Sequence, residues 1–267
     1  MHFKRCLTAA IAVPVLIYII GVAPRWLFHI LLLFAAVQGL IEFYRFTSPE
    51  LPRIVRWSVF VLTFGLFFFI SRGELFVIPV IAFLWAVIPM AYFMVTYPSS
   101  DNHPTEVIGK AVLAPLYVVL PLSLLMTIDT FPRGNIWIFF LLSVVFAGDT
   151  GAFYFGRVLG KHRLHPKVSP GKTWEGAAGG LLASLLVALL WGQFSTLYSL
   201  GLRILALTIL LSATSQIGDL TESMLKRSHS VKDSGGILPG HGGILDRIDG
   251  LLFSIPVQYL FLTWSVP

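Results

Sequence analysis

The chain has 267 residues, of which 56% are hydrophobic and only 12% are charged, and its formal net charge is +6. Soluble domains carry about 25% charged residues, so a soluble protein of this length is excluded, because it would lack the polar surface to cover such a core. A single cysteine, Cys6, also excludes an intrachain disulfide and a cysteine-based zinc site. The mean hydropathy of +0.82 indicates instead a chain that crosses a membrane several times.

Nine apolar stretches approach the roughly 20 residues that a helix needs to cross the hydrocarbon layer. The first follows Lys4 and Arg5 as in a signal peptide, but Pro24 would stand just after the only suitable cleavage site, so we interpret it as an uncleaved helix. Later spans contain prolines such as Pro115, which membrane helices tolerate because neighbouring groups satisfy the freed carbonyls. The predicted fold class is all-α and polytopic, with spans at about 7–23, 26–46, 56–71, 75–97, 108–127, 136–155, 176–194, 202–225 and 250–266.

We expect a single membrane domain over 1–267, with N-terminal spans in 1–135 and a catalytic half in 136–267. An N-terminus inside the cell would place 15 of the 19 basic residues in cytoplasmic segments and only four outside. This positive-inside bias predicts that the C-terminus is outside and that the hydrophilic connections 156–175 and 226–249 face the cytoplasm. The positive net charge then reflects anionic lipid rather than nucleic acid.

Acidic residues are scarce, and five of the thirteen lie between Asp219 and Asp249. On a helix Ser215, Asp219 and Ser223 share one face, and Asp246 and Asp249 point the same way at the entrance to the last span. A carboxylate at the bilayer centre costs roughly 2.5–3.5 kcal/mol, which favours a functional role for Asp219. Two pairs of oxygen ligands on two helix ends predict a Mg²⁺ site that waters and phosphates complete.

Other acids in these spans are less specific. Glu222 is better explained as a helix-stabilising partner of Lys226, four residues later, than as a ligand. For Asp233, which stands beside Lys232 in a loop, a functional role and an ordinary loop position fit the sequence equally well. Asp149, near the cytoplasmic end of the sixth span, favours function for the same reason as Asp219.

The connection before the seventh span carries residue types that suit an anion. Lys167, Ser169 and Lys172 lead into the N-terminus of that span, whose amides favour phosphate, although basic residues touching lipid headgroups would look the same. It is not a Walker A loop, since Pro166 stands where glycine is required and no strand is expected before it. The GxxxG pattern of Gly176 and Gly180 predicts close helix packing within the chain in preference to a dimer contact.

Three segments of the C-terminal half resemble the phosphatidate cytidylyltransferases, also called CDP-diglyceride synthases. The longest holds about a dozen of the family's fixed residues within 27 positions, which makes chance a poor explanation. The matching residues are Ser223, Lys226, Arg227, Lys232, Asp233, Gly235, Pro239, His241, Gly242, Gly243, Asp246, Arg247 and Asp249, with Gly148, Asp149 and Thr150 in the second segment and Ser169 to Thr173 with Glu175 and Gly176 in the third.

The resemblance implies a magnesium-dependent, all-helical membrane enzyme, a homodimer, that makes CDP-diacylglycerol and pyrophosphate from CTP and phosphatidate at its cytoplasmic face. The resemblance leaves open whether a second cation binds beside Mg²⁺. Carried onto this chain, the metal ligands fall on Asp219, Asp246 and Asp249, and Lys226 and Arg227 join Asp219 and Asp246 as catalytic residues. The implied substrate contacts are Ser223, Lys167, Lys172, Ser169, Asp149, His241 and Arg247.

Two other functions use similar parts. A CTP-dependent lipid or polyprenol kinase would attack the γ-phosphate instead of the α-phosphate. A membrane transporter would also need intramembrane carboxylates, but transport sites lie near the midplane, whereas these acids gather towards one face.

Overall fold

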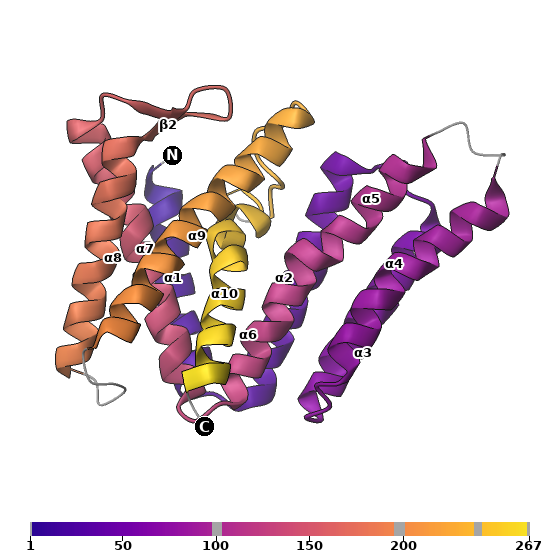
Figure 1. Cartoon of the computed structure of the whole chain (residues 1–267), viewed down its shortest axis with the longest axis horizontal. Coiled ribbons are helices and arrows are strands. Elements are labelled where there is room, and N and C mark those ends of the chain that lie inside the picture. Colours follow the sequence, from indigo (N-terminus) through magenta and orange to yellow (C-terminus); the bar gives the residue numbers. More distant parts are fainter. Residues whose placement is uncertain (1, 98–102, 195–200, 238–241, 266–267) are drawn as a thin grey trace. The chain divides into compact units, whose positions relative to one another are not determined.

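The computed structural model describes residues 2–97, 103–194, 201–237 and 242–265 (Figure 1). Within these ranges every predicted span coincides with a helix, and the fifth span is a continuous helical rod made of α5, η1 and α6. The helices are α1 His2–Gly21, α2 Arg25–Thr47, α3 Arg53–Ser71, α4 Val77–Thr96, α5 Pro104–Ala114, the π-helical turn η1 Pro115–Val119, α6 Leu120–Thr130, α7 Gly134–Leu159, α8 Trp174–Phe194, α9 Leu202–Ser228 and α10 Leu245–Ser265.

The outward faces of these helices are apolar. On α3, Trp57, Phe64 and Phe68 follow one another at helical spacing and are 66%, 51% and 58% exposed. Such a stripe is unfavourable in water but suits hydrocarbon. Seven helices of the described part of the chain, with α5 to α6 taken as one, are long and apolar enough to cross a membrane. The protein is therefore an all-α integral membrane protein, as predicted.

The chain groups into two compact units, one formed by 1–126 with 233–246 and the other by 127–232 with 247–267. In the first unit α2 packs against α3 and against η1. The contact with η1 is close: the Phe43 and Tyr117 rings lie 5.9 Å apart, and a Cβ on Gly39 would come within 2.7 Å of the Val118 side chain. The core of this unit is thus built around the middle of the rod.

Pro115 determines the shape of the rod. Proline lacks the N–H that would bond the carbonyl of Ala111 one turn earlier, and its ring crowds that carbonyl. The π-turn absorbs the proline, with the Leu120 amide donating to the Pro115 carbonyl. The Tyr44 hydroxyl on α2 then donates a 2.9 Å hydrogen bond to the Ala111 carbonyl oxygen. A neighbouring helix satisfies the freed carbonyl, which confirms the tolerance expected of this span.

Replacing Tyr44 by phenylalanine should therefore lower stability without altering the fold. The Ala111 carbonyl would remain buried without its donor, at a cost of about 1–3 kcal/mol. Thermal unfolding in detergent, followed by tryptophan fluorescence, should show a transition several degrees lower for Tyr44→Phe. The control is Tyr97→Phe at the end of α4, where the side chain is 66% exposed. An equal shift for both variants would contradict the role of this hydrogen bond.

In the second unit, α7 and α8 lie side by side with their backbones in contact (Figure 1). A Cβ on Gly180 would lie 2.7 Å from the Gly148 carbonyl oxygen, and one on Gly176 would lie 2.8 Å from that of Ala152. Neither position has room for a side chain. The GxxxG pattern therefore serves helix packing within the chain, as predicted. Gln216 of α9 joins this pair by donating to the Ala177 carbonyl at 3.2 Å.

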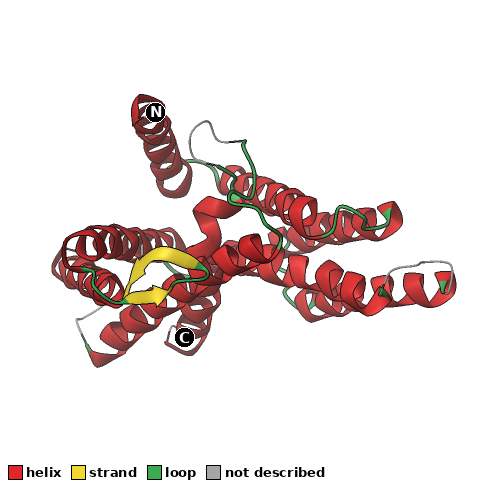
Figure 2. Cartoon of the chain, turned by 90° about the horizontal axis from the view of Figure 1, so that it is seen from above, coloured by secondary structure: helices red, strands yellow, loops and turns green. Residues whose placement is uncertain are grey.

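A short β-hairpin connects α7 to α8, and the sequence did not predict it (Figure 2). Strand β1, Arg163–His165, pairs antiparallel with β2, Ser169–Thr173. The expectation that no strand precedes Pro166 was wrong, although proline still excludes a Walker A loop at this position. The fold class remains all-α with this one addition in the described residues.

Side chains at the junction of β2 and α8 hold the hairpin in place. Thr173 caps the helix, its buried hydroxyl accepting the Gly176 amide at 3.0 Å. Glu175 accepts the backbone amides of Lys161 and His162 at 3.1 and 3.2 Å and contacts the His162 ring nitrogen Nδ1 at 2.6 Å. These bonds fix both ends of the connection, so the side chains of β2 project from a defined backbone.

Candidate active site

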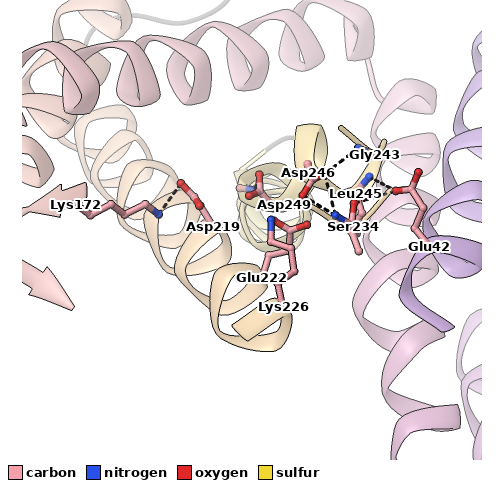
Figure 3. A network of polar contacts seen from close by, with 11 residues as sticks. Glu42, Lys172, Asp219, Glu222, Lys226, Ser234, Gly243, Leu245, Asp246 and Asp249 are labelled. Atoms are coloured by element: carbon pink, nitrogen blue, oxygen red, sulfur yellow. Dashed lines mark hydrogen bonds and ion pairs between the residues drawn. The ribbon is translucent and has the colours of Figure 1, made fainter. Parts of the chain in front are cut away.

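An ion pair joins the hairpin to α9. Lys172 of β2 extends to Asp219, with 2.5 Å between Lys172 Nζ and Asp219 Oδ2 (Figure 3). The side chains are 28% and 36% exposed, and the Lys172 ammonium nitrogen itself is buried against the carboxylate. The structure thus brings together a predicted cation and a predicted carboxylate that are far apart in the sequence. The Lys172 ammonium group and the Asp219 carboxylate stabilise each other, because each neutralises a charge that is costly to bury.

Asp219 and Asp249 lie where α9 crosses α10. A Cβ on Gly218 would lie 2.6 Å from the Asp249 carbonyl oxygen, and one on Gly250 would lie 2.5 Å from the Ser215 hydroxyl. Glycine at both positions lets the two backbones touch. Because Asp219 follows Gly218 and Asp249 precedes Gly250, the helix crossing places both carboxylates in one region.

Further charges surround this crossing. Asp249 interacts with the Glu222 side chain and lies within electrostatic range of Asp219 and Asp149. Asp149, on α7, is in turn within electrostatic range of Lys172. Carboxylates this close repel one another unless they share a proton or a cation. The second unit therefore contains a cluster of acids whose mutual repulsion basic side chains or a bound cation would relieve.

Lys226 supplies part of that charge. Its Nζ lies 2.7 Å from Glu222 Oε2 on α9, and the two side chains are 12% and 1% exposed (Figure 3). The pair spans one helical turn, as the sequence predicted. Glu222 also reaches Asp249, which the sequence did not predict because that contact crosses to another helix.

Asp246 organises the start of α10. Its carboxylate accepts the Ser234 amide at 3.1 and 3.2 Å and the Gly243 amide at 2.8 Å (Figure 3). The bond to Gly243, three residues back, resembles a capping box. Gly242 has a φ of 80°, which favours glycine, and a Cβ there would come within 2.6 Å of Asp246 Oδ2. Asp246 is thus tied to its own loop, one turn before Asp249 on the same helix.

The remaining predicted contacts are more exposed. Lys167 lies in the turn of the hairpin and Ser169 at the start of β2. Arg227 lies exposed at the end of α9, with Ser223 half-buried one turn earlier, and Arg247 is exposed on α10 within electrostatic range of Asp149. His241 lies outside the described residues.

The model of the Cytidylyltransferase family matches residues 3–265. The chain belongs to this cytidylyltransferase family. The match extends through the N-terminal half, where the sequence motifs alone gave no assignment. The family match therefore covers both the N-terminal spans and the helices that carry the clustered acids.

Relatives in the cytidylyltransferase family match over nearly their whole length. A phosphatidate cytidylyltransferase of Staphylococcus saprophyticus is 34% identical over 268 residues, which cover 97% of this chain and 98% of the relative. The protein of the same name from Bacillus subtilis strain 168 is 33% identical, with 97% of each chain covered. That of Brucella suis biovar 1 is 37% identical, covering 91% of this chain and 89% of the relative.

The acids of this cytidylyltransferase suit Mg²⁺ better than a metal held by protein alone. Among the described residues, no three or more His, Cys, Asp or Glu side chains converge as a ready metal centre. The Ser215 hydroxyl, buried at the crossing of α9 and α10, makes no hydrogen bond within the described structure. A small number of carboxylate oxygens beside a buried hydroxyl matches an ion that keeps waters and is completed by phosphates.

One buried acid was missed in the sequence. Glu42 lies inside the second predicted span, and the argument that favours a role for Asp219 applies equally to it. Its carboxylate contacts the segment that carries Asp246. A lone acid in a largely apolar span was the signal that could have identified it.

Proposed function

We propose that this chain makes CDP-diacylglycerol and pyrophosphate from phosphatidate and CTP in a magnesium-dependent reaction. The observation that carries the proposal is the Lys172–Asp219 ion pair beside the acid cluster at the crossing of α9 and α10. Cations and carboxylates grouped in one region suit a substrate that brings phosphates and their metal together.

The chemistry requires charge control more than proton transfer. A phosphate oxygen of phosphatidate attacks the α-phosphorus of CTP, the bond to the β-phosphate breaks, and pyrophosphate leaves with the electron pair. The attacking phosphate monoester is already largely deprotonated at pH 7, so no general base is needed. Repulsion between the two anions is the main barrier, which positioned cations lower.

The residues divide between these tasks. Lys172, Lys226 and Arg227 would bind and orient the phosphates, the first from the hairpin and the other two from the end of α9. Asp219 and Asp249 would hold Mg²⁺, with Asp246 one turn earlier on α10 as the third predicted ligand. The bound ion would neutralise phosphate charge and align the reacting groups.

The decisive test is product analysis with purified protein. Phosphatidate in mixed micelles and CTP labelled on the α-phosphate should give labelled CDP-lipid and pyrophosphate, and chelation of magnesium should abolish both products. Release of CDP with a newly phosphorylated lipid would identify a lipid kinase instead. Absence of any lipid product, with substrate uptake into proteoliposomes, would favour a transporter.

We also infer that the site opens to the cytoplasm, because the basic residues are concentrated there in the predicted topology. In a Cys6→Ala background, Lys232→Cys should react with a membrane-impermeant maleimide in inverted vesicles but not in intact cells. Pro132→Cys, between α6 and α7, should give the opposite pattern. Both positions are exposed, so lack of reaction reports membrane sidedness and not burial. Labelling of Lys232→Cys in intact cells would overturn this orientation.

A further inference from the structure

Glu42 lies fully buried on α2, where its carboxylate gathers four hydrogen-bond donors. It accepts the backbone amides of Leu245 at 2.9 Å and Ile244 at 3.1 Å, and the Ser234 hydroxyl at 3.2 Å (Figure 3). Gln38 donates the fourth bond, at 3.1 Å from its Nε2 to Glu42 Oε1. Three of the four donors come from the segment that leads into α10, about 200 residues later in the chain.

Two of these donors are the amides at which α10 begins. The first amides of a helix have no partner within the helix and carry partial positive charge. Glu42 therefore caps α10 from a different part of the chain. A carboxylate on its own would be costly to bury, but hydrogen bonds from amides at a helix N-terminus favour its charged form.

Glycines of the family signature make room for this carboxylate. A Cβ on Gly235 would lie 2.7 Å from Glu42 Oε1, and one on Gly243 would lie 2.4 Å from Oε2. Gly236, the next residue after Gly235, has nothing within 4 Å of the same position. Glu42 thus accounts for two glycines that the sequence motif alone leaves unexplained.

The same segment is tied to Asp246. Ser234 donates its amide to Asp246 and its hydroxyl to Glu42, and Gly243, whose amide bonds Asp246, immediately precedes the two amides that bond Glu42. The segment is therefore held between two carboxylates. Any movement of Glu42 would shift the donors that orient the carboxylate of Asp246.

We propose that Glu42 is a positioning residue of the cytidylyltransfer reaction: it fixes the N-terminus of α10 and thereby the direction of the Asp246 carboxylate. The proposal rests on the proposed function, in which Asp246 serves the reaction. Glu42 itself need not touch substrate, and its effect reaches the site through Ser234 and Gly243.

The primary test is Glu42→Gln, which keeps the size of the side chain but replaces one carboxylate oxygen by an amide NH2 group. Both oxygens accept hydrogen bonds, so this substitution sets a donor against a donor. We expect kcat to fall about 10- to 100-fold, the range typical of residues that orient a ligand, with KM for CTP changed less than threefold. Trypsin should cleave after Lys232 and Arg247 at least fivefold faster than in the wild type, because the segment between them loses its anchor. Glu50→Gln, which changes an exposed acid just beyond α2, is the matched control.

A second pair of variants covers the case in which Glu42→Gln does not fold. Gly235→Ala pushes directly against the carboxylate, whereas Gly236→Ala adds the same methyl group into open space. Gly235→Ala should reproduce both the loss of kcat and the faster cleavage, and Gly236→Ala should match the wild type. Equal behaviour of the two alanine variants would overturn the proposal.

The outcomes separate this proposal from a purely structural role and from the proposed function. Faster cleavage with kcat within twofold of the wild type would show that Glu42 only stabilises the segment, and would refute positioning. Unchanged cleavage would refute the anchoring itself. Failure of the wild type to make CDP-lipid would refute the proposed function, while the cleavage experiment would still report whether Glu42 anchors α10.

Discussion

Asp219→Asn should reduce kcat about 100-fold or more while leaving expression and membrane insertion unchanged. The carboxylate lies 2.5 Å from Lys172 Nζ and stands at the crossing of α9 and α10, so it is next to both the proposed phosphate-binding lysine and the other acids. Several kcal/mol of charge stabilisation depend on such a ligand, and each 1.36 kcal/mol corresponds to a tenfold change in rate. Turnover should be measured in mixed micelles over a range of Mg²⁺ concentrations.

The magnesium series distinguishes Asp219 from Asp246. Raised Mg²⁺ should partly restore Asp219→Asn, because the variant weakens binding of the ion without disturbing the backbone. Asp246→Asn should be restored less, since its carboxylate also accepts the Ser234 and Gly243 amides. Glu50→Gln alters an exposed acid just beyond α2 and should keep wild-type turnover. Near-normal turnover of Asp219→Asn would remove the metal-site assignment.

The helices could be predicted because hydropathy and length decide them. A membrane span needs only an apolar run of sufficient length, and each of the nine predicted stretches overlaps a helix of the described structure for most of its length. The π-turn at Pro115 shows what hydropathy leaves out. A missing donor at Pro115 is visible in the sequence, but the identity of its substitute, Tyr44, depends on how α2 packs.

The hairpin could not be predicted for a related reason. Strands of three and five residues carry no usable periodicity, and Pro170 argues against a strand. Its order comes from Thr173 and Glu175, side chains that cap α8 and bind the other end of the connection. Local sequence thus singled out Lys172 as a candidate phosphate contact but did not predict the backbone that presents it.

The candidate site was predicted in part, and best in α9, which carries Asp219 and Glu222. Asp219 stood out because it is a charge in an apolar helix, and the Glu222–Lys226 pair because of its spacing. Glu42 was missed because it stands alone in the sequence, far from the acids between Asp219 and Asp249. Its partners are backbone amides of α10, which have no signature in the sequence of α2.

Lys226→Ala should have the second large effect, on stability and turnover together. Lys226 Nζ lies 2.7 Å from Glu222 Oε2, and Glu222 is almost fully buried. Removing one member of a buried pair costs about 3–5 kcal/mol, because the other charge remains in a medium of low polarity. The variant should unfold at a clearly lower temperature in detergent and should turn over about 100-fold more slowly, as expected for loss of a contact that strengthens in the transition state.

The double variant Glu222→Gln with Lys226→Ala separates the two effects. Neutral glutamine no longer needs the ammonium group, so thermal stability should return to within a few degrees of the wild type. If Lys226 also binds phosphate, kcat should remain low in the stable double variant. Arg227→Ala, which changes an exposed neighbour, should lower kcat with little change in stability. Recovery of full turnover in the double variant would show that Lys226 only balances Glu222, and the phosphate role of this lysine would then be rejected.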